Sequence, residues 1–570
     1  LGHQALTSVT TGDHNVGVGY LALGNSTTAG TNTAVGNYAG ASITTGGNNV
    51  SIGYTSLNTV TVGTDNIAIG KDSGKYTTGS YNTFVGSEAG QGGTTSAPYS
   101  SGTSNTAIGY QALKGFTTGG SNTAVGFYSG KSITTATSNT LMGIFSGDAL
   151  TTGGENTAIG HSALSAEDTG TRNVAVGNQA FIKLNYDGTG YNTGLGYGVG
   201  YHNVLGVSNT YLGGQAGVNA TGSYNTFVGH LAGYGGNTSA PFSSGQNNVA
   251  VGYYALKNFT TGYSNVAIGS HAMDAITDSY HAIGIGAGAL GGTTSTLGSV
   301  VLGTNAGNNA TFGNYNIIMG YTNGQGALGT MNTFIGGAET GRAATSDYAI
   351  GIGAYALRNT TATGNVGIGH KALQLNTSGA GNLAIGYEAL KVHTTGARNI
   401  AIGWEAMHDT NAGSTAQGSE DNIFMGYSAG GGTWANAASN GNVGIGNYSM
   451  DAALNGALYN TAVGTYAASA ITSADNVTAI GNSAAYSLTT GANNIAIGFR
   501  AMVTHTTGAN NIAIGTNAME DTDAGSTSLG STNNIFMGYE AGGGIWADAA
   551  SNENVAIGNY AMDGALDGAL

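Results

Sequence analysis

Large aromatic side chains are the residues of this chain best suited to binding, and four of them stand in or beside its longest spacers. Such rings can stack on the apolar face of a sugar or on a neighbouring strand. They are Tyr99, Phe242, Trp434 and Trp546. Because long connecting segments carry binding residues disproportionately often, these spacers are candidate contact loops. The alternative is that the rings cover the flank of the fold or join a subunit interface.

Catalytic and metal-binding chemistry has little support in the sequence. The chain has no cysteine, which excludes thiolate catalysis and cysteine-zinc sites. His161, His230 and His370 follow recurring motifs but lie far apart, and the acidic residues show no established calcium-loop spacing. The "GIGAGAL" run at Gly284 lacks the βαβ context of a dinucleotide loop. We therefore expect no enzyme activity, no cofactor and no bound metal.

The composition excludes several classes of partner. Glycine accounts for 103 of 570 residues, only 7% of residues are charged, and the formal net charge is −15. Nucleic acid is disfavoured as a partner, because its phosphates are met by clustered Lys and Arg. No run approaches the roughly 20 apolar residues of a membrane-spanning helix. Hydrophobic residues nevertheless reach 40%, so the chain can bury a core and is not disordered.

A five-residue motif recurs along the whole chain and sets its architecture. "NTAVG" at residues 32–36 returns at 122–126, and "NTAIG", "NVAIG" and "NIAIG" occur throughout. The closing glycines define 32 rungs from Gly2 to Gly558, most of them 17 residues apart and four of them 23 residues apart. A fixed period of this kind is typical of a solenoid, in which each unit buries its apolar face only against its neighbours.

The motif itself predicts a β-strand. Its side chains alternate with a period of two, and β-branched residues and glycine-rich turns disfavour a helix. We expect an all-β fold, a parallel β-solenoid of the β-roll or β-helix type, with about 17 residues in each coil and an elongated rod shape. Alternation would place the aliphatic residue before the glycine in the core and Ala34 on the other face. The residues predicted to form this core include Val35, Ile52, Ile108, Val125, Ile497 and Ile557.

The asparagine that opens the motif is predicted to form a ladder. Stacked side-chain amides can hydrogen-bond to their copies on the coils above and below. The predicted ladder includes Asn32, Asn49, Asn66, Asn105, Asn122, Asn494 and Asn511. Ala282, Ser299, Ala349 and Val477 interrupt this series.

The whole chain, residues 1–570, is predicted to be one continuous repeat array with internal duplications. Residues 82–126 resemble residues 225–269, and residues 399–458 resemble residues 511–570. The array begins within a motif and ends just before the next asparagine is due, so we expect it to be an interior fragment of a longer chain.

The motifs also resemble those of a known family. "NVAIGNYAM" at Asn554 and "NTAVGNYAG" at Asn32 resemble the head repeats of trimeric autotransporter adhesins. "NTAIGYQAL" at Asn105 is similar to repeats of phage tail fibres and bacterial surface fibres. The resemblance implies a left-handed parallel β-roll, a homotrimer and a role in adhesion at a cell or virion surface. The rungs here are longer than in the autotransporter pattern.

These observations favour an extracellular fibre shaft, with a long rigid rod that presents loop surfaces for attachment. A second hypothesis is a subunit of a helical extracellular filament, glycosylated on exposed residues, whose chains pack through small-residue faces such as Ala34 and Ala107. A third is a solenoid that binds ice or polysaccharide, although a regular T-x-T ladder is missing. The expected partners are further copies of this chain, as a homotrimer or filament, and a surface glycan or host-surface receptor.

Overall fold

The computed structural model describes residues 1–236, 238–308, 311–326, 328–337, 339–342, 344–409, 418–520, 530–544 and 550–564. These residues contain 31 β-strands of three residues each, and no α-helix. Each strand lies between the first position of one motif and its closing glycine, and turns connect it to the next. The predicted all-β parallel solenoid is therefore confirmed. The first of the 32 predicted rungs, at Leu1–Gly2, carries no strand.

The coils form two units, residues 1–295 and residues 296–570. The strands of the first unit are β1 (Val16–Val18), β2 (Thr33–Val35), β3 (Val50–Ile52), β4 (Ile67–Ile69), β5 (Thr83–Val85), β6 (Thr106–Ile108), β7 (Thr123–Val125), β8 (Thr140–Met142), β9 (Thr157–Ile159), β10 (Val174–Val176), β11 (Thr193–Leu195), β12 (Thr210–Leu212), β13 (Thr226–Val228), β14 (Val249–Val251), β15 (Val266–Ile268) and β16 (Ile283–Ile285). The strands of the second unit are β17 (Val300–Leu302), β18 (Ile317–Met319), β19 (Thr333–Ile335), β20 (Ile350–Ile352), β21 (Val366–Ile368), β22 (Leu383–Ile385), β23 (Ile400–Ile402), β24 (Ile423–Met425), β25 (Val443–Ile445), β26 (Thr461–Val463), β27 (Thr478–Ile480), β28 (Ile495–Ile497), β29 (Ile512–Ile514), β30 (Ile535–Met537) and β31 (Val555–Ile557).

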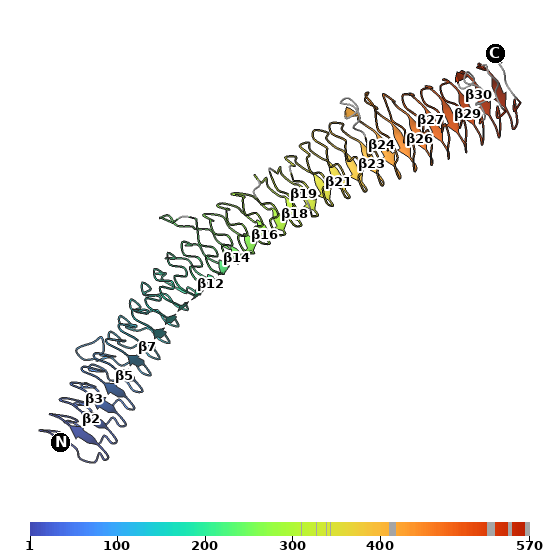
Figure 1. Ribbon diagram of the computed structural model, residues 1–570. Coiled ribbons are helices and arrows are strands. Elements are labelled where there is room, and N and C mark those ends of the chain that lie inside the picture. The colour runs from blue at the N-terminus through green and yellow to red at the C-terminus, as the bar shows by residue number, and fades with distance from the viewer. Residues whose placement is uncertain are drawn as a thin grey trace. The chain divides into compact units, whose positions relative to one another are not determined.

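Within each unit, consecutive strands pair in parallel with every motif directly over the next. In the first unit Ala34 of β2 lies opposite Ser51 of β3, and in the second Ala496 of β28 lies opposite Ala513 of β29. Figure 1 shows the strand arrows of each unit following one another along one side of the coils. At about 4.8 Å between strands, the stack of β1–β16 is about 70 Å long.

Hydrogen bonds between coils continue beyond the strands. The backbone N–H of Thr27 donates to Thr44 O at 3.0 Å, and the N–H of Thr44 donates to Thr61 O at 2.9 Å. Isolated parallel bridges, such as the one between Thr77 and Ser100, add pairings on the far side of the coil. Each coil thus satisfies its backbone polar groups mainly through its neighbours, which is why a single coil has no stable fold of its own.

The closing glycine makes the corner at the end of each strand. Gly36 has a φ of +135°, which side chains disfavour, and a Cβ atom built there would lie 2.5 Å from the carbonyl oxygen of Gly53 on the next coil. The same positive φ occurs at the closing glycines along the array, from Gly19 to Gly558. Both the turn and the close approach of successive coils therefore require a residue without a side chain.

The core lies on the opposite face of the strand from the one that we expected. In all 31 strands the middle residue is buried and the two flanking residues are not. Ala34 and Ala107 are fully buried, whereas Val35 is 37% exposed and Ile108 is 40% exposed. The prediction that the aliphatic residue before the glycine forms the core is wrong. None of the predicted core residues is buried, namely Val35, Ile52, Ile108, Val125, Ile497 and Ile557.

The interior of each coil is narrow. A large side chain at the middle strand position is matched by a small residue four positions after the closing glycine, and the reverse also occurs. Where the middle strand residue is Ala107, Leu113 fills the space beside it on the same coil. Where the middle residue is Phe84, the corresponding position is Gly90, and a Cβ atom there would lie 2.3 Å from the Phe84 ring. Phe227 and Gly233 show the same exchange. The coil therefore holds one large side chain at this level, contributed by either of two positions.

Candidate functional site

The asparagine side chains form a buried ladder that is interrupted at Ala282, Ser299, Ala349 and Val477. Asn122 is fully buried. Its Nδ2 atom donates hydrogen bonds to Asn105 Oδ1 at 3.1 Å and to Ala136 O at 2.9 Å, and its backbone N–H donates to Asn105 Oδ1 at 3.0 Å. Asn139 repeats the pattern on Asn122. Similar contacts join the other ladder residues named above, including Asn32 to Asn49, Asn49 to Asn66, and Asn494 to Asn511. The ladder aligns each coil on its neighbour and is a structural feature, not a binding site.

The outward residues of the strands form an exposed apolar surface, here called the outer strand face. It consists of the first and third residues of every strand, and the third residue is Val, Ile, Leu or Met throughout. Threonine opens most strands of the first unit but only β19, β26 and β27 of the second. The predicted core residues all lie on this face, and Ile557 on β31 is 72% exposed. Exposed apolar patches of this extent mark interaction surfaces in soluble proteins.

Aromatic rings stack along the outside of the coils, directly after the closing glycines. The ring centroids of Tyr387 and Trp404 are 4.1 Å apart and those of His370 and Tyr387 are 5.3 Å apart, both in stacked geometry. Trp404 is 49% exposed. In the first unit, Tyr110 stacks on Phe127 with centroids 5.4 Å apart. The sequence places tyrosine or histidine directly after many closing glycines, and Trp404 occupies the same position, although it was not among the predicted contact residues.

Two of the predicted contact residues, Tyr99 and Phe242, pack against other rings on the outside of the coils. Tyr99 is half-buried and stacks on Tyr76, with ring centroids 6.3 Å apart. Phe242 is half-buried and stacks on His202, with centroids 4.1 Å apart. Both rings thus rest on the flank of the solenoid. Trp546 lies outside the described residues.

Trp434 is a core residue, and its prediction as a contact residue is wrong. It is fully buried, its Nε1 atom donates to Gly430 O at 2.9 Å, and its ring meets that of Phe424 edge to face with centroids 5.9 Å apart. Because Gly430 leaves the space beside Phe424 free, the tryptophan of the following segment can enter the coil. Trp434 thus fills the interior of its coil beside Phe424.

Charged side chains gather on the outside at the second residue after the closing glycine and three residues further along. Glu388 bonds to Lys371 at 3.0 Å, to Lys391 at 2.8 Å and to His408 at 2.8 Å, all measured between nitrogen and carboxylate oxygen. Although burial alone would raise it, the hydrogen bonds from these three groups lower the pKa of Glu388 to about 2. These pairs join neighbouring coils electrostatically.

The same positions carry ion pairs in the first duplicated block and on the coil just before it. Lys75 pairs with Asp72 at 3.0 Å, and Lys114 pairs with Glu88 at 2.6 Å. Gln111 donates from Nε2 to Glu88 at 2.8 Å. The hydrogen bond from Lys114 lowers the pKa of Glu88. Each of these lysines therefore has its own carboxylate.

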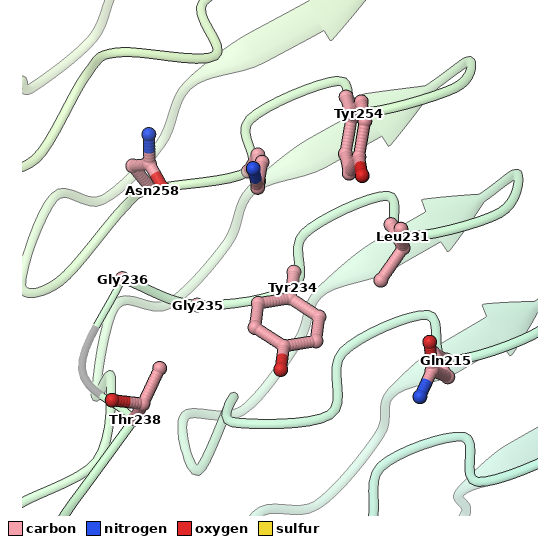
Figure 2. A pocket seen from close by; sticks show the side chains of 9 residues that line it. Gln215, Leu231, Tyr234, Gly235, Gly236, Thr238, Tyr254 and Asn258 are labelled. Carbon is pink, nitrogen blue, oxygen red and sulfur yellow. The ribbon is translucent and has the colours of Figure 1, made fainter.

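The second duplicated block holds a hollow at the equivalent positions. Its volume is about 420 Å³, and its lining includes Gln215, Leu231, Tyr234, Thr238, Lys257 and Asn258. Figure 2 shows Gln215, Leu231 and Tyr254 in one column on three successive coils, with Tyr234 and Asn258 beside them and Thr238 opposite Tyr234. The hollow is lined largely by residues of the 23-residue coil between Gly229 and Gly252, the coil that also carries Phe242.

Sequence reasoning missed this hollow, although the duplication contained a signal for it. Residues 82–126 and 225–269 align without gaps, so Glu88 corresponds to Leu231 and Lys114 corresponds to Lys257. The lysine is retained while its carboxylate is lost. A comparison of the two blocks position by position could have found this change.

Other chemistry was also examined across the described ranges. No group of three or more His, Asp or Glu side chains there is placed to hold a metal ion. No helix in that part of the chain is long and apolar enough to cross a membrane. No family model matches the sequence, and no curated protein matches it either.

Proposed function

We propose that this chain is a shaft segment of an extracellular fibre, in which several copies associate lengthwise through the outer strand face. The solenoid fold is compatible with a structural, rod-like protein. The observation that supports association is the unbroken register of exposed or half-exposed Val, Ile, Leu and Met side chains at the third strand position. Burying a half-exposed aliphatic side chain contributes on the order of 1 kcal/mol, and this face repeats it on every coil.

The size of the face is adequate for a stable assembly. A standard protein interface uses about 20–30 residues from each partner. The 16 strands of the first unit offer two outward residues each, and the 15 strands of the second offer the same. Because threonine is rarer on the outer strand face of β17–β31, that unit should contribute more of the association energy.

The family resemblance of the motifs supports the remaining features of the proposal. It favours three copies per fibre, a left-handed β-roll and a place at a cell or virion surface. The filament hypothesis needs a different contact from the one first considered, because Ala34 and Ala107 are fully buried and cannot pack against another chain. A threonine-based ice-binding surface gains no support, since the third position of each strand is apolar.

The mass of the protein in solution tests this proposal. We expect sedimentation or light scattering to give three times the chain mass of 56.3 kDa. Replacing Ile385 and Ile402 on the outer strand face with arginine should shift the protein toward the single-chain mass, because unpaired charges would be buried at the contact. Ser378 and Thr395 lie exposed on the same two coils, so the Ser378→Arg/Thr395→Arg variant is the matched control and should keep the assembled mass.

Two results would contradict association through this face. One is a wild-type mass of a single chain at micromolar concentration. The other is an assembled mass that survives Ile385→Arg/Ile402→Arg while circular dichroism shows the fold intact. Electron microscopy of the native particle then separates a surface fibre of fixed length from a polymer of indefinite length.

A further inference from the structure

The structure assigns a binding site for a carboxylate-bearing saccharide to the hollow between Gln215 and Asn258. This site is independent of the outer strand face and of whether the chains associate. It is defined by six side chains of three successive coils, contributed by Gln215, Leu231, Tyr234, Thr238, Lys257 and Asn258. The second duplicated block differs from the first in the charged side chains around this hollow.

The decisive change is the removal of carboxylates around a retained lysine. In the first block Glu88 pairs with Lys114, and on the coil just before that block Asp72 pairs with Lys75. At the equivalent positions of the second block and the coil before it, Leu231 replaces Glu88, Gln215 replaces Asp72 and Val218 replaces Lys75. Lys257 remains without the carboxylate that pairs with Lys114.

Lys257 is positioned by the ring of Tyr254 on its own coil. Its Nζ atom lies over the ring of Tyr254, 4.3 Å from the centroid, in cation–π geometry. Among the described residues Lys257 forms no direct ion pair, although it interacts electrostatically with Asp274 on the following coil, where burial raises the pKa of the carboxyl group and the charge of Lys257 lowers it. The ammonium group is therefore positioned at the hollow and available to a carboxylate of a ligand.

The rest of the lining suits a sugar. Tyr234 and Leu231 offer apolar surface to the C–H face of a pyranose ring, as aromatic and aliphatic side chains do in binding pockets. Gln215 and Asn258 carry amides that can both donate and accept, and Thr238 carries a hydroxyl group, which matches the mixed character of sugar hydroxyls. A volume of about 420 Å³ lies within the range of about 300–1,000 Å³ found for small-molecule sites.

The long coil explains why the hollow occurs here. The spacer between β13 and β14 carries Phe242, and this ring stacks on His202, which belongs to a coil two positions earlier in the array. The contact anchors this part of the spacer to the flank of the solenoid. Gly235 and Gly236 line the hollow at the start of this spacer and leave it open. The first block carries a spacer of equal length, so the spacer alone does not make the site.

Calorimetric titration of the full-length protein with trigalacturonic acid tests the assignment. We expect saturable binding, and at least tenfold weaker binding of the neutral analogue galactotriose, because only the acid can pair with Lys257. Lys257→Gln should weaken binding of the acid at least tenfold. Leu231→Glu should do the same by restoring the carboxylate that Glu88 provides to Lys114.

Lys114→Gln is the matched control, since it removes the equivalent lysine of the first block and should change affinity less than twofold. Circular dichroism of all three variants shows whether each remains folded. The assignment is overturned if trigalacturonic acid does not bind at millimolar concentration, if galactotriose binds equally well, or if Lys257→Gln leaves the affinity unchanged. Equal binding of the peptide Glu-Glu-Glu would overturn it too, because that result would show a site for any anion.

Discussion

At the scale of single residues, two positions of each coil share one interior space, so a large side chain at one position requires a small residue at the other. Phe84 and Gly90 on one coil are replaced by Ala107 and Leu113 on the next. Leu113 has a φ of +49° and Gly90 a φ of +53°, so the backbone at this position already accommodates leucine. The two positions should therefore be energetically coupled.

A double-mutant cycle on Phe84 and Gly90 tests this coupling. Phe84→Ala should destabilise the protein by about 3–5 kcal/mol, because it leaves a cavity in a fully buried site. Gly90→Leu should also be destabilising, since the new side chain would overlap the Phe84 ring. The double variant should recover most of the loss, as measured by chemical unfolding. Additive effects of the two substitutions would contradict the exchange.

The same scale shows where sequence reasoning succeeded and where it failed. The asparagine ladder was predictable, because one polar residue at a fixed place in every coil has to find its partner on the next coil. The side-chain alternation was also predictable, but it does not say which of two apolar faces points inward. The middle strand position lies inside whether it holds alanine, as at Ala34, or phenylalanine, as at Phe84, while Val35 and Ile108 remain outside. Hydrophobicity and periodicity alone therefore do not decide the face.

At the scale of elements, the coils that precede the two Asp- and Gly-rich 23-residue spacers contain a buried histidine. His393 and His505 stand seven residues after the closing glycine, where Ile43 and Leu150 stand in other coils. Both histidines are fully buried. His393 Nε2 lies 3.1 Å from Asn399 Nδ2, and His505 Nε2 lies 3.1 Å from Asn511 Nδ2. The asparagine ladder and the apolar core thus meet at a titratable group.

These histidines make stability depend on pH. Burial lowers the pKa of each from an ordinary value near 6.5 to about 4. The unfolded chain therefore binds more protons than the folded one between these values, so the histidine contribution is complete above pH 6.5 and is lost as the pH falls toward 4. The loss amounts to about 3 kcal/mol for each histidine.

The His393→Leu variant measures this contribution. We expect its unfolding midpoint in urea to fall less than that of the wild-type protein between pH 7 and pH 4.5, since an aliphatic residue at this position does not titrate. Comparing the two proteins separates the histidine from carboxyl groups that titrate in the same range. His161 is exposed, and His161→Leu should leave the wild-type pH dependence in place. Equal pH dependence in all three proteins would rule out the buried histidine as its source.

The long spacers show a second limit of sequence reasoning at this scale. Extra length predicted surface loops, yet Trp434 of one such segment fills the core while Phe242 of another covers the flank. The length of an inserted segment therefore does not determine whether its aromatic side chain enters the core or lies on the surface. The buried position of Trp434 depends on the space beside Phe424 and Gly430, which becomes visible only when both lie on one coil.

At the scale of the molecule, the duplicated blocks indicate that coils are interchangeable units of length. Asn82 and Asn225 occupy the same place in the ladder, and each is preceded by a Ser-Tyr pair. In a solenoid each coil contacts only its neighbours, so stability is roughly a sum over coils and interfaces. Removing a whole number of coils should shorten the first unit without exposing its core.

Deletion of residues 82–224 tests this interchangeability, because it joins Tyr81 to Asn225 and leaves each remaining motif in phase. We expect the shortened protein to keep the far-ultraviolet dichroism per residue of the full chain and to unfold within a few degrees of it. Deletion of residues 82–220 is the control, since it leaves four extra residues at the junction and shifts β13 out of register with β4. If both deletions fold equally well, the register of asparagine and glycine is not what holds the coils together; if neither folds, the coils are not interchangeable. Folding of the in-phase deletion alone would show that length in this protein can vary coil by coil while its cross-section, ladder and outer strand face stay the same.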